Sequence, residues 1–64
     1  MLKKPTVKLI GENGNVFNLT AICVLGLRQE GYSEEQVQEF KDEVTSSKSY
    51  NEALNAMNEW CEVE

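Results

Sequence analysis

One segment, residues 19–30, is apolar on nearly every side when it is drawn as a helix. Its apolar residues form a central stripe and a second set that widens the stripe: Leu19, Ile22, Cys23 and Leu27, then Ala21, Val24 and Leu25. A helix of this kind lies at the centre of a core or is covered by another chain. Because a chain of 64 residues builds only a small core, we expect a second copy to cover the helix. The chain is therefore predicted to be an oligomer, most simply a dimer.

Local signals set the end of this helix and the start of two more. Gly31 suits the left-handed backbone conformation that commonly follows a helix. Ser33-Glu34-Glu35-Gln36 is a capping box. It predicts a helix to about Val44, with Val37, Phe40 and Val44 turned inward. Ser49-Tyr50-Asn51-Glu52 is a second capping box and predicts a third helix.

The residues before the first helix predict a β-hairpin. Residues 6–10 are rich in β-branched side chains, and Val7 and Leu9 share one face of the predicted strand. Asn13-Gly14 favours a tight hairpin turn, after which Val16-Phe17 would return as a second strand. Asn18 would then cap the helix. The alternative begins the helix at Asn15 instead.

The C-terminal residues 62–64 alternate with Cys61 and could add a last strand beside the hairpin. The predicted fold class is therefore α+β: an N-terminal β-hairpin followed by three short helices, with a possible short C-terminal strand. Length and the lack of a linker predict one small domain over residues 1–64.

The sequence argues against catalysis and against a metal centre. It has no histidine, which removes the general base of most acyl-transfer triads and the usual zinc quartets. Cys23 and Cys61 form no Cys-x-x-Cys pair and sit in apolar surroundings. We expect buried free thiols, and a Cys23–Cys61 disulfide stays open. We predict a non-enzymatic protein with no metal and no cofactor.

The loop 11–15, Gly-Glu-Asn-Gly-Asn, lacks the lysine of a phosphate-binding loop and the several carboxylates of a calcium loop. A plain turn is the favoured interpretation. Its tip, formed by Glu12, Asn13 and Asn15, is retained as a candidate partner contact.

Charge is unevenly distributed along the chain. Eleven acidic residues face six basic ones, for a net charge of −5. The candidate contact surface is an acidic stripe on the second predicted helix, and its members are Glu35, Glu39, Asp42 and Glu43. Such a stripe could bind a protein with a basic surface, or it could be an ordinary solvated face. It argues against direct binding of nucleic acid, which needs clustered Lys and Arg.

Residues 7–17, Val-Lys-Leu-Ile-Gly-Glu-Asn-Gly-Asn-Val-Phe, resemble the opening of small uncharacterised proteins from phages and mobile elements of Gram-positive bacteria. Gly31-Tyr32-Ser33, Ser49-Tyr50 and the acidic end after Trp60 continue the resemblance over most of the chain. The resemblance implies no activity and no known site. It implies an accessory role of the phage type, including inhibition of a host defence protein.

These observations lead to one functional hypothesis and two alternatives. The hypothesis is a phage or mobile-element protein that binds and inhibits a host protein through its acidic surface. The alternatives are an oligomer that sequesters a nucleotide signal, for which Lys8, Arg28 or Lys48 would have to converge, and a structural or assembly subunit. No signal-peptide core follows the basic residues 1–5, and no apolar run approaches the length of a membrane span. We expect a location in the cytoplasm of the bacterial host, without membrane contact.

Overall fold

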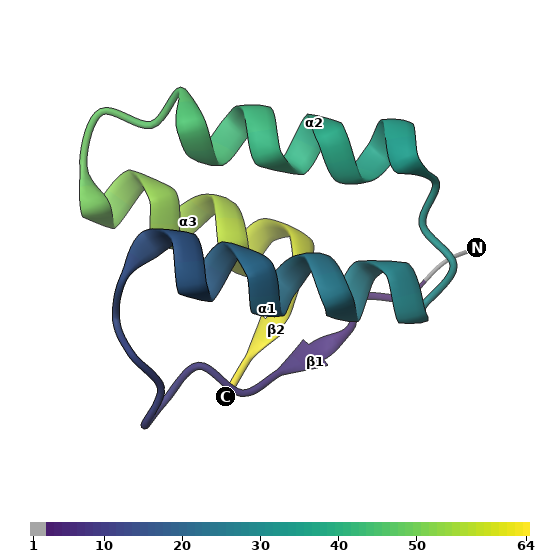
Figure 1. Cartoon of the computed structure of the whole chain (residues 1–64), viewed down its shortest axis with the longest axis horizontal. Coiled ribbons are helices and arrows are strands. Elements are labelled where there is room, and N and C mark those ends of the chain that lie inside the picture. The colour runs from purple at the N-terminus through teal and green to yellow at the C-terminus, as the bar shows by residue number, and fades with distance from the viewer. Residues whose placement is uncertain (1–2) are drawn as a thin grey trace.

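The computed structural model describes residues 3–64, and it has an α+β fold with three helices and two very short strands (Figure 1). The elements follow in the order β1 (Thr6–Val7), α1 (Val16–Gln29), α2 (Glu34–Thr45), α3 (Tyr50–Trp60) and β2 (Glu62–Val63). The predicted basic start of the chain includes Met1 and Leu2, which lie outside the described residues.

The predicted N-terminal hairpin is wrong, whereas the C-terminal strand is confirmed. β1 pairs with β2 in parallel, with Thr6 opposite Glu62 and Val7 opposite Val63. The amide of Glu62 donates to the carbonyl oxygen of Pro5, and the amide of Glu64 donates to that of Val7, each at 2.8 Å. Strands β1 and β2, which are far apart in sequence, therefore lie side by side beneath the helices, as Figure 1 shows.

The hairpin fails because its second strand is the first turn of α1. The side-chain oxygen of Asn15 accepts a hydrogen bond from the amide of Phe17 at 2.8 Å and caps the helix. The alternative that begins the helix at Asn15 is thus confirmed. Asn18 is not the cap, and its side chain donates to the carbonyl oxygen of Asn13 instead. The turn itself lies earlier, where Gly11 adopts φ +87° and the amide of Glu12 donates to Leu9.

The predicted helix ends are otherwise correct. Gly31 has φ +95°, and the amides of Gly31 and Tyr32 donate to the carbonyls of Arg28 and Leu27, which is a Schellman motif. Ser33 and Gln36 make both hydrogen bonds of the first capping box. At α3, the hydroxyl of Ser49 accepts from the amide of Glu52, which is one half of the second predicted box.

The core gathers buried residues from β1 and the three helices, with Val63 of β2 packed against it, and its largest fully buried side chains include Phe40, Leu27, Met57 and Val37. Both cysteines are buried in this core as free thiols. Gly26 lies against β1, because a Cβ built there would come within 2.8 Å of a Val7 methyl group and 3.2 Å of the Pro5 Cβ. Helix α1 therefore buries one side against the rest of the molecule and leaves the opposite side free.

Candidate protein-binding surfaces

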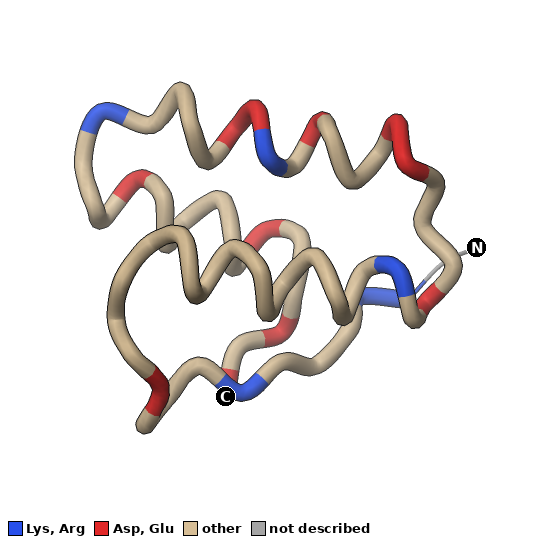
Figure 2. Tube along the Cα trace, in the orientation of Figure 1, with Lys and Arg blue, Asp and Glu red and all other residues tan. Residues whose placement is uncertain are grey.

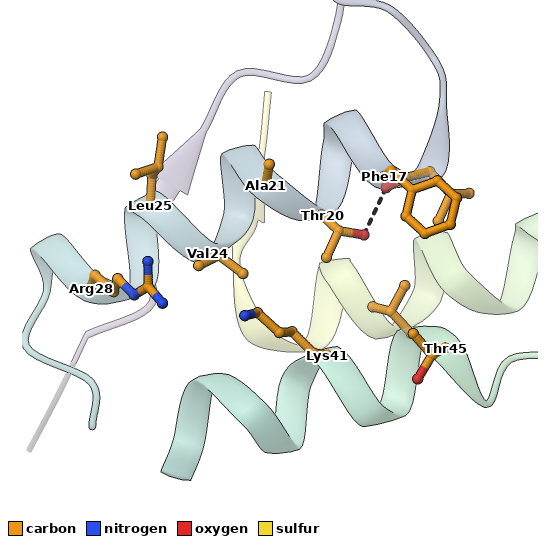
Figure 3. A pocket seen from close by; sticks show the side chains of 10 residues that line it. Phe17, Thr20, Ala21, Val24, Leu25, Arg28, Lys41 and Thr45 are labelled. Carbon is orange, nitrogen blue, oxygen red and sulfur yellow. Dashed lines mark hydrogen bonds between the residues drawn. The ribbon is translucent and has the colours of Figure 1, made fainter. Parts of the chain in front are cut away.

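A groove of about 810 Å³ runs between α1 and α2 (Figure 3). Helix α1 contributes Val16, Phe17, Thr20, Ala21, Val24, Leu25 and Arg28 to its lining, and α2 contributes Lys41, Val44 and Thr45. Most of these side chains are apolar or small. A concave apolar surface of this size is typical of a binding site for an apolar group.

The polar groups at the groove are largely engaged within the chain. The hydroxyl of Thr20 donates to the carbonyl oxygen of Val16 at 2.7 Å. The guanidinium of Arg28 makes two hydrogen bonds to the carboxylate of Glu34, at 3.0 and 3.1 Å. The ammonium of Lys41 makes no hydrogen bond or ion pair with residues 3–64, and its stem extends from α2 toward α1 (Figure 3). The groove therefore offers apolar surface and one ammonium group, that of Lys41, with no ion-pair partner in residues 3–64.

The outer rim of the groove carries unusually exposed apolar side chains. Phe17 is 79% exposed and Leu25 is 59% exposed. With Ala21 between them, these residues are spaced i, i+4 and i+8 along one side of α1. The sequence pattern predicts Ala21 and Leu25 as additional apolar residues of the helix, but it predicts a strand for Phe17. The alternative prediction, in which the helix begins at Asn15, places Phe17 in the same row as Ala21 and Leu25.

Three of the four predicted acidic residues form the outer side of α2. Glu35, Glu39 and Asp42 are exposed and lie opposite the buried Val37, Phe40 and Val44. We call Glu35, Glu39 and Asp42 the acidic ridge. Acidic segments recur along α2 in Figure 2. Within residues 3–64 the one ion pair joins Arg28 to Glu34, so no basic side chain neutralises the ridge.

Glu43, the fourth predicted member, is not part of the ridge. Its carboxylate accepts a hydrogen bond from the indole nitrogen of Trp60 at 3.0 Å, so it points along the α3 side of α2. Trp60 in turn packs against Phe40, with ring centroids 5.8 Å apart. Glu43 therefore takes part in a hydrogen bond between α2 and α3. Its i, i+4 spacing from Glu39 indicates only that both residues lie near the same side of α2, so it does not predict this hydrogen bond.

The loop tip is separate from both surfaces. Asn13 accepts from the amide of Asn15 through its side chain, and Asn15 caps α1. The carbonyl oxygen of Gly14 accepts from the hydroxyl of Tyr50 at 2.6 Å. Glu12 is exposed at this turn. The side chains of the two asparagines thus hold the loop in place, which leaves Glu12 as the exposed charged side chain of the loop.

The three cations considered for a nucleotide site belong to different parts of the chain. Lys8 follows β1, Arg28 is in the last turn of α1, and Lys48 lies between α2 and α3. The basic segments are correspondingly scattered along the trace in Figure 2. A single copy of the chain therefore does not gather these cations into one pocket.

The two buried thiols interact with each other in the core. A hydrogen bond in which the Cys23 thiol donates to the Cys61 sulfur raises the pKa of Cys23 far above its ordinary value, and burial raises it further. Accepting the same hydrogen bond lowers the pKa of Cys61. In residues 3–64 no group of three or more His, Cys, Asp or Glu side chains could hold a metal ion. No helix within that range has the length and apolar character to cross a membrane.

Comparison of the chain with protein-family models, with curated proteins and with solved structures gave no match. The acidic ridge and the apolar groove are therefore the two candidate binding surfaces of the described chain.

Proposed function

We propose that this protein is a non-enzymatic binding protein that docks on a basic surface of another protein through the acidic ridge of α2. The observation that carries the proposal is the position of Glu35, Glu39 and Asp42, exposed together on the outer side of one rigid helix. The resemblance to small phage and mobile-element proteins directs the proposal to a host protein as the partner, with inhibition as the outcome.

The electrostatic cost of the ridge supports a binding role. Like charges one helical turn apart destabilise a helix by a few tenths of a kcal/mol, and Glu35 and Glu39 have this spacing. Within residues 3–64 no salt bridge offsets the repulsion at the ridge. A basic partner would remove the repulsion and would also be steered toward the ridge during association.

The test compares two variants that lose the same charge. The ridge variant is Glu35→Gln, Glu39→Gln, Asp42→Asn. Its control is Glu30→Gln, Glu59→Gln, Glu62→Gln, which neutralises three exposed carboxylates outside α2. Tagged wild type and both variants are used to capture proteins from bacterial host extract at low and at high ionic strength.

We expect wild type and control to retain the same host protein at low salt, and the ridge variant to lose it. With the captured protein purified, the association rate should fall at least about tenfold in the ridge variant. Added salt should slow wild type more than the ridge variant. Equal rates and equal salt slopes for the two variants would contradict docking through the ridge.

A further inference from the structure

The exposed row on α1 has a symmetry that a second copy of this chain would match. Ala21 is the small residue at its centre, and Phe17 and Leu25 lie about 6 Å before and after it along the helix axis. A two-fold axis passing beside Ala21 sets two α1 helices antiparallel. It then places Phe17 of each copy against Leu25 of the other.

We propose that α1 is the interface of a two-fold dimer, in which Phe17 of each copy enters the α1–α2 groove of the other copy. Val24 is directed from α1 toward α2 within the groove, whereas Leu25, which also lines it, is directed away from α2 and forms its outer rim (Figure 3). Phe17 of the other copy would therefore meet Leu25 at this rim. Phe17 is 79% exposed, so the described residues 3–64 leave most of its side chain uncovered. The groove of one copy is thus completed by a residue from the other, as an isologous interface requires.

Charge favours a second copy on this face over any other face. Helix α1 spans 14 residues without a carboxylate, although the chain has eleven acidic residues. Two acidic chains that meet through α1 therefore bring no opposing carboxylates from this helix together. Arg28 is already paired with Glu34, and the stem of Lys41 can cover apolar surface while its ammonium reaches solvent.

The shape of the molecule supplies enough surface for such a dimer. The chain measures 29 × 25 × 15 Å along its principal axes. The view down the shortest axis shows α1 crossing in front of α3 on the broad face (Figure 1). The outline of the whole molecule in this view, 29 × 25 Å, is of the same order as the roughly 800 Å² per partner of a standard interface. An interface made by α1 and the groove alone is smaller than this outline. The acidic ridge on α2 remains outside this interface, so the dimer proposal does not depend on the proposed function.

The test uses three single variants of the full chain and sedimentation equilibrium over a range of concentrations. Wild type should change from the mass of one chain to that of two as its concentration rises. Phe17→Lys and Leu25→Glu should each raise the dissociation constant at least about tenfold, because each places a charge against an apolar side chain. Ile10→Lys is the matched control, since Ile10 is 73% exposed but lies outside α1. This control should dimerise like wild type.

Mixing the two α1 variants tests the antiparallel register. In a mixed dimer, the introduced lysine of one copy would face the introduced glutamate of the other, and the second contact would pair the natural Leu25 with the natural Phe17. An equimolar mixture should therefore form a dimer with one copy of each, as read by native mass spectrometry. Helical circular dichroism should be unchanged in each variant, because Phe17 and Leu25 are exposed in the monomer. If either variant loses this signal, Ala21→Gln replaces it and should weaken the dimer through bulk at the axis.

Three results would overturn the proposal: a wild type with the mass of one chain at every concentration, an Ile10→Lys variant that weakens the dimer as much as Phe17→Lys, or folded variants that form no mixed dimer. If wild type is monomeric, the groove would be a site for a segment of another protein instead of for a second copy. That result would not affect the proposal of docking through the ridge. Salt separates the two proposals as well. It should leave the dimer intact or strengthen it by screening the net charge of −5, whereas it should weaken ridge docking.

Discussion

The indole nitrogen of Trp60 donates a hydrogen bond to the carboxylate of Glu43 across the α2–α3 interface, with 3.0 Å between the two atoms. This bond divides the acidic residues of α2 into two kinds. Glu43 ties α2 to the last residue of α3, whereas Glu39, one turn earlier, is exposed without such a bond.

Glu43→Ala should therefore lower the free energy of unfolding by about 0.5–1 kcal/mol, because the indole loses a hydrogen-bond acceptor at a solvent-accessible site. Glu39→Ala should stay within about 0.5 kcal/mol of wild type. Urea unfolding monitored by Trp60 fluorescence and by circular dichroism measures both values. Equal effects of the two substitutions would show that the Trp60 bond contributes nothing to stability.

Asn15→Ala should destabilise the protein by about 1 kcal/mol, because the amide of Phe17 loses the side-chain oxygen that caps α1. Asn18→Ala is the comparison variant. If Val16 and Phe17 formed the second strand of a hairpin, the helix would start later and Asn18 would be its cap. In the structure Asn18 makes an exposed bond to the loop, so its loss should cost less. A larger effect at Asn18 than at Asn15, measured by urea unfolding, would contradict the helix start at Val16.

Gly26→Ala should destabilise the protein by about 1–2 kcal/mol, although alanine normally favours a helix over glycine by about 1 kcal/mol. The reason is the approach of β1, which leaves 2.8 Å between the new Cβ and a methyl group of Val7. Combining Gly26→Ala with Val7→Ala should recover part of the loss from overcrowding, so the two effects should not add. Additive effects in this double-mutant cycle would mean that β1 does not press on Gly26.

Cys23 should resist alkylation by iodoacetamide at neutral pH in the native protein. Its thiol is buried, and its pKa is raised by the hydrogen bond that it donates to Cys61 and by burial, so the reactive thiolate is scarce. Modification should become fast only above the urea midpoint of unfolding. Mass spectrometry of peptides after timed quenching gives the rate at Cys23. Rapid native labelling would contradict the closed packing of α1 against the C-terminal residues.

Much of the local structure could be predicted from residues that are close together in the chain. The Ser33–Gln36 box starts α2, Gly31 ends α1 with a positive φ, and Val37, Phe40 and Val44 face the core. The alternation of Val7 and Leu9 also predicted their burial. These features depend on hydrogen bonds and side-chain spacing within one or two turns, so neighbouring residues suffice to define them.

The candidate surfaces were predicted only in part. The spacing of Glu35, Glu39 and Asp42 was enough to place the acidic ridge, because these residues belong to one helix. The groove needs α1 and α2 side by side, and its lining includes Phe17 and Lys41, which the sequence argument had assigned to no surface. The role of Glu43 likewise depends on Trp60, a residue seventeen positions away on another helix.

The choice between hairpin and helix for Val16 and Phe17 was made by tertiary structure. Both conformations are locally reasonable, since Asn13-Gly14 favours a turn and Asn15 is a good helix cap. Residues near the far end of the chain decide the outcome, because Glu62 and Glu64 supply the backbone donors that pair with Pro5 and Val7. β1 then needs no second strand from the hairpin, and Val16-Phe17 is free to extend α1. Strand pairing joins residues that are distant in sequence, so a pattern of neighbouring residues cannot identify the partner strand.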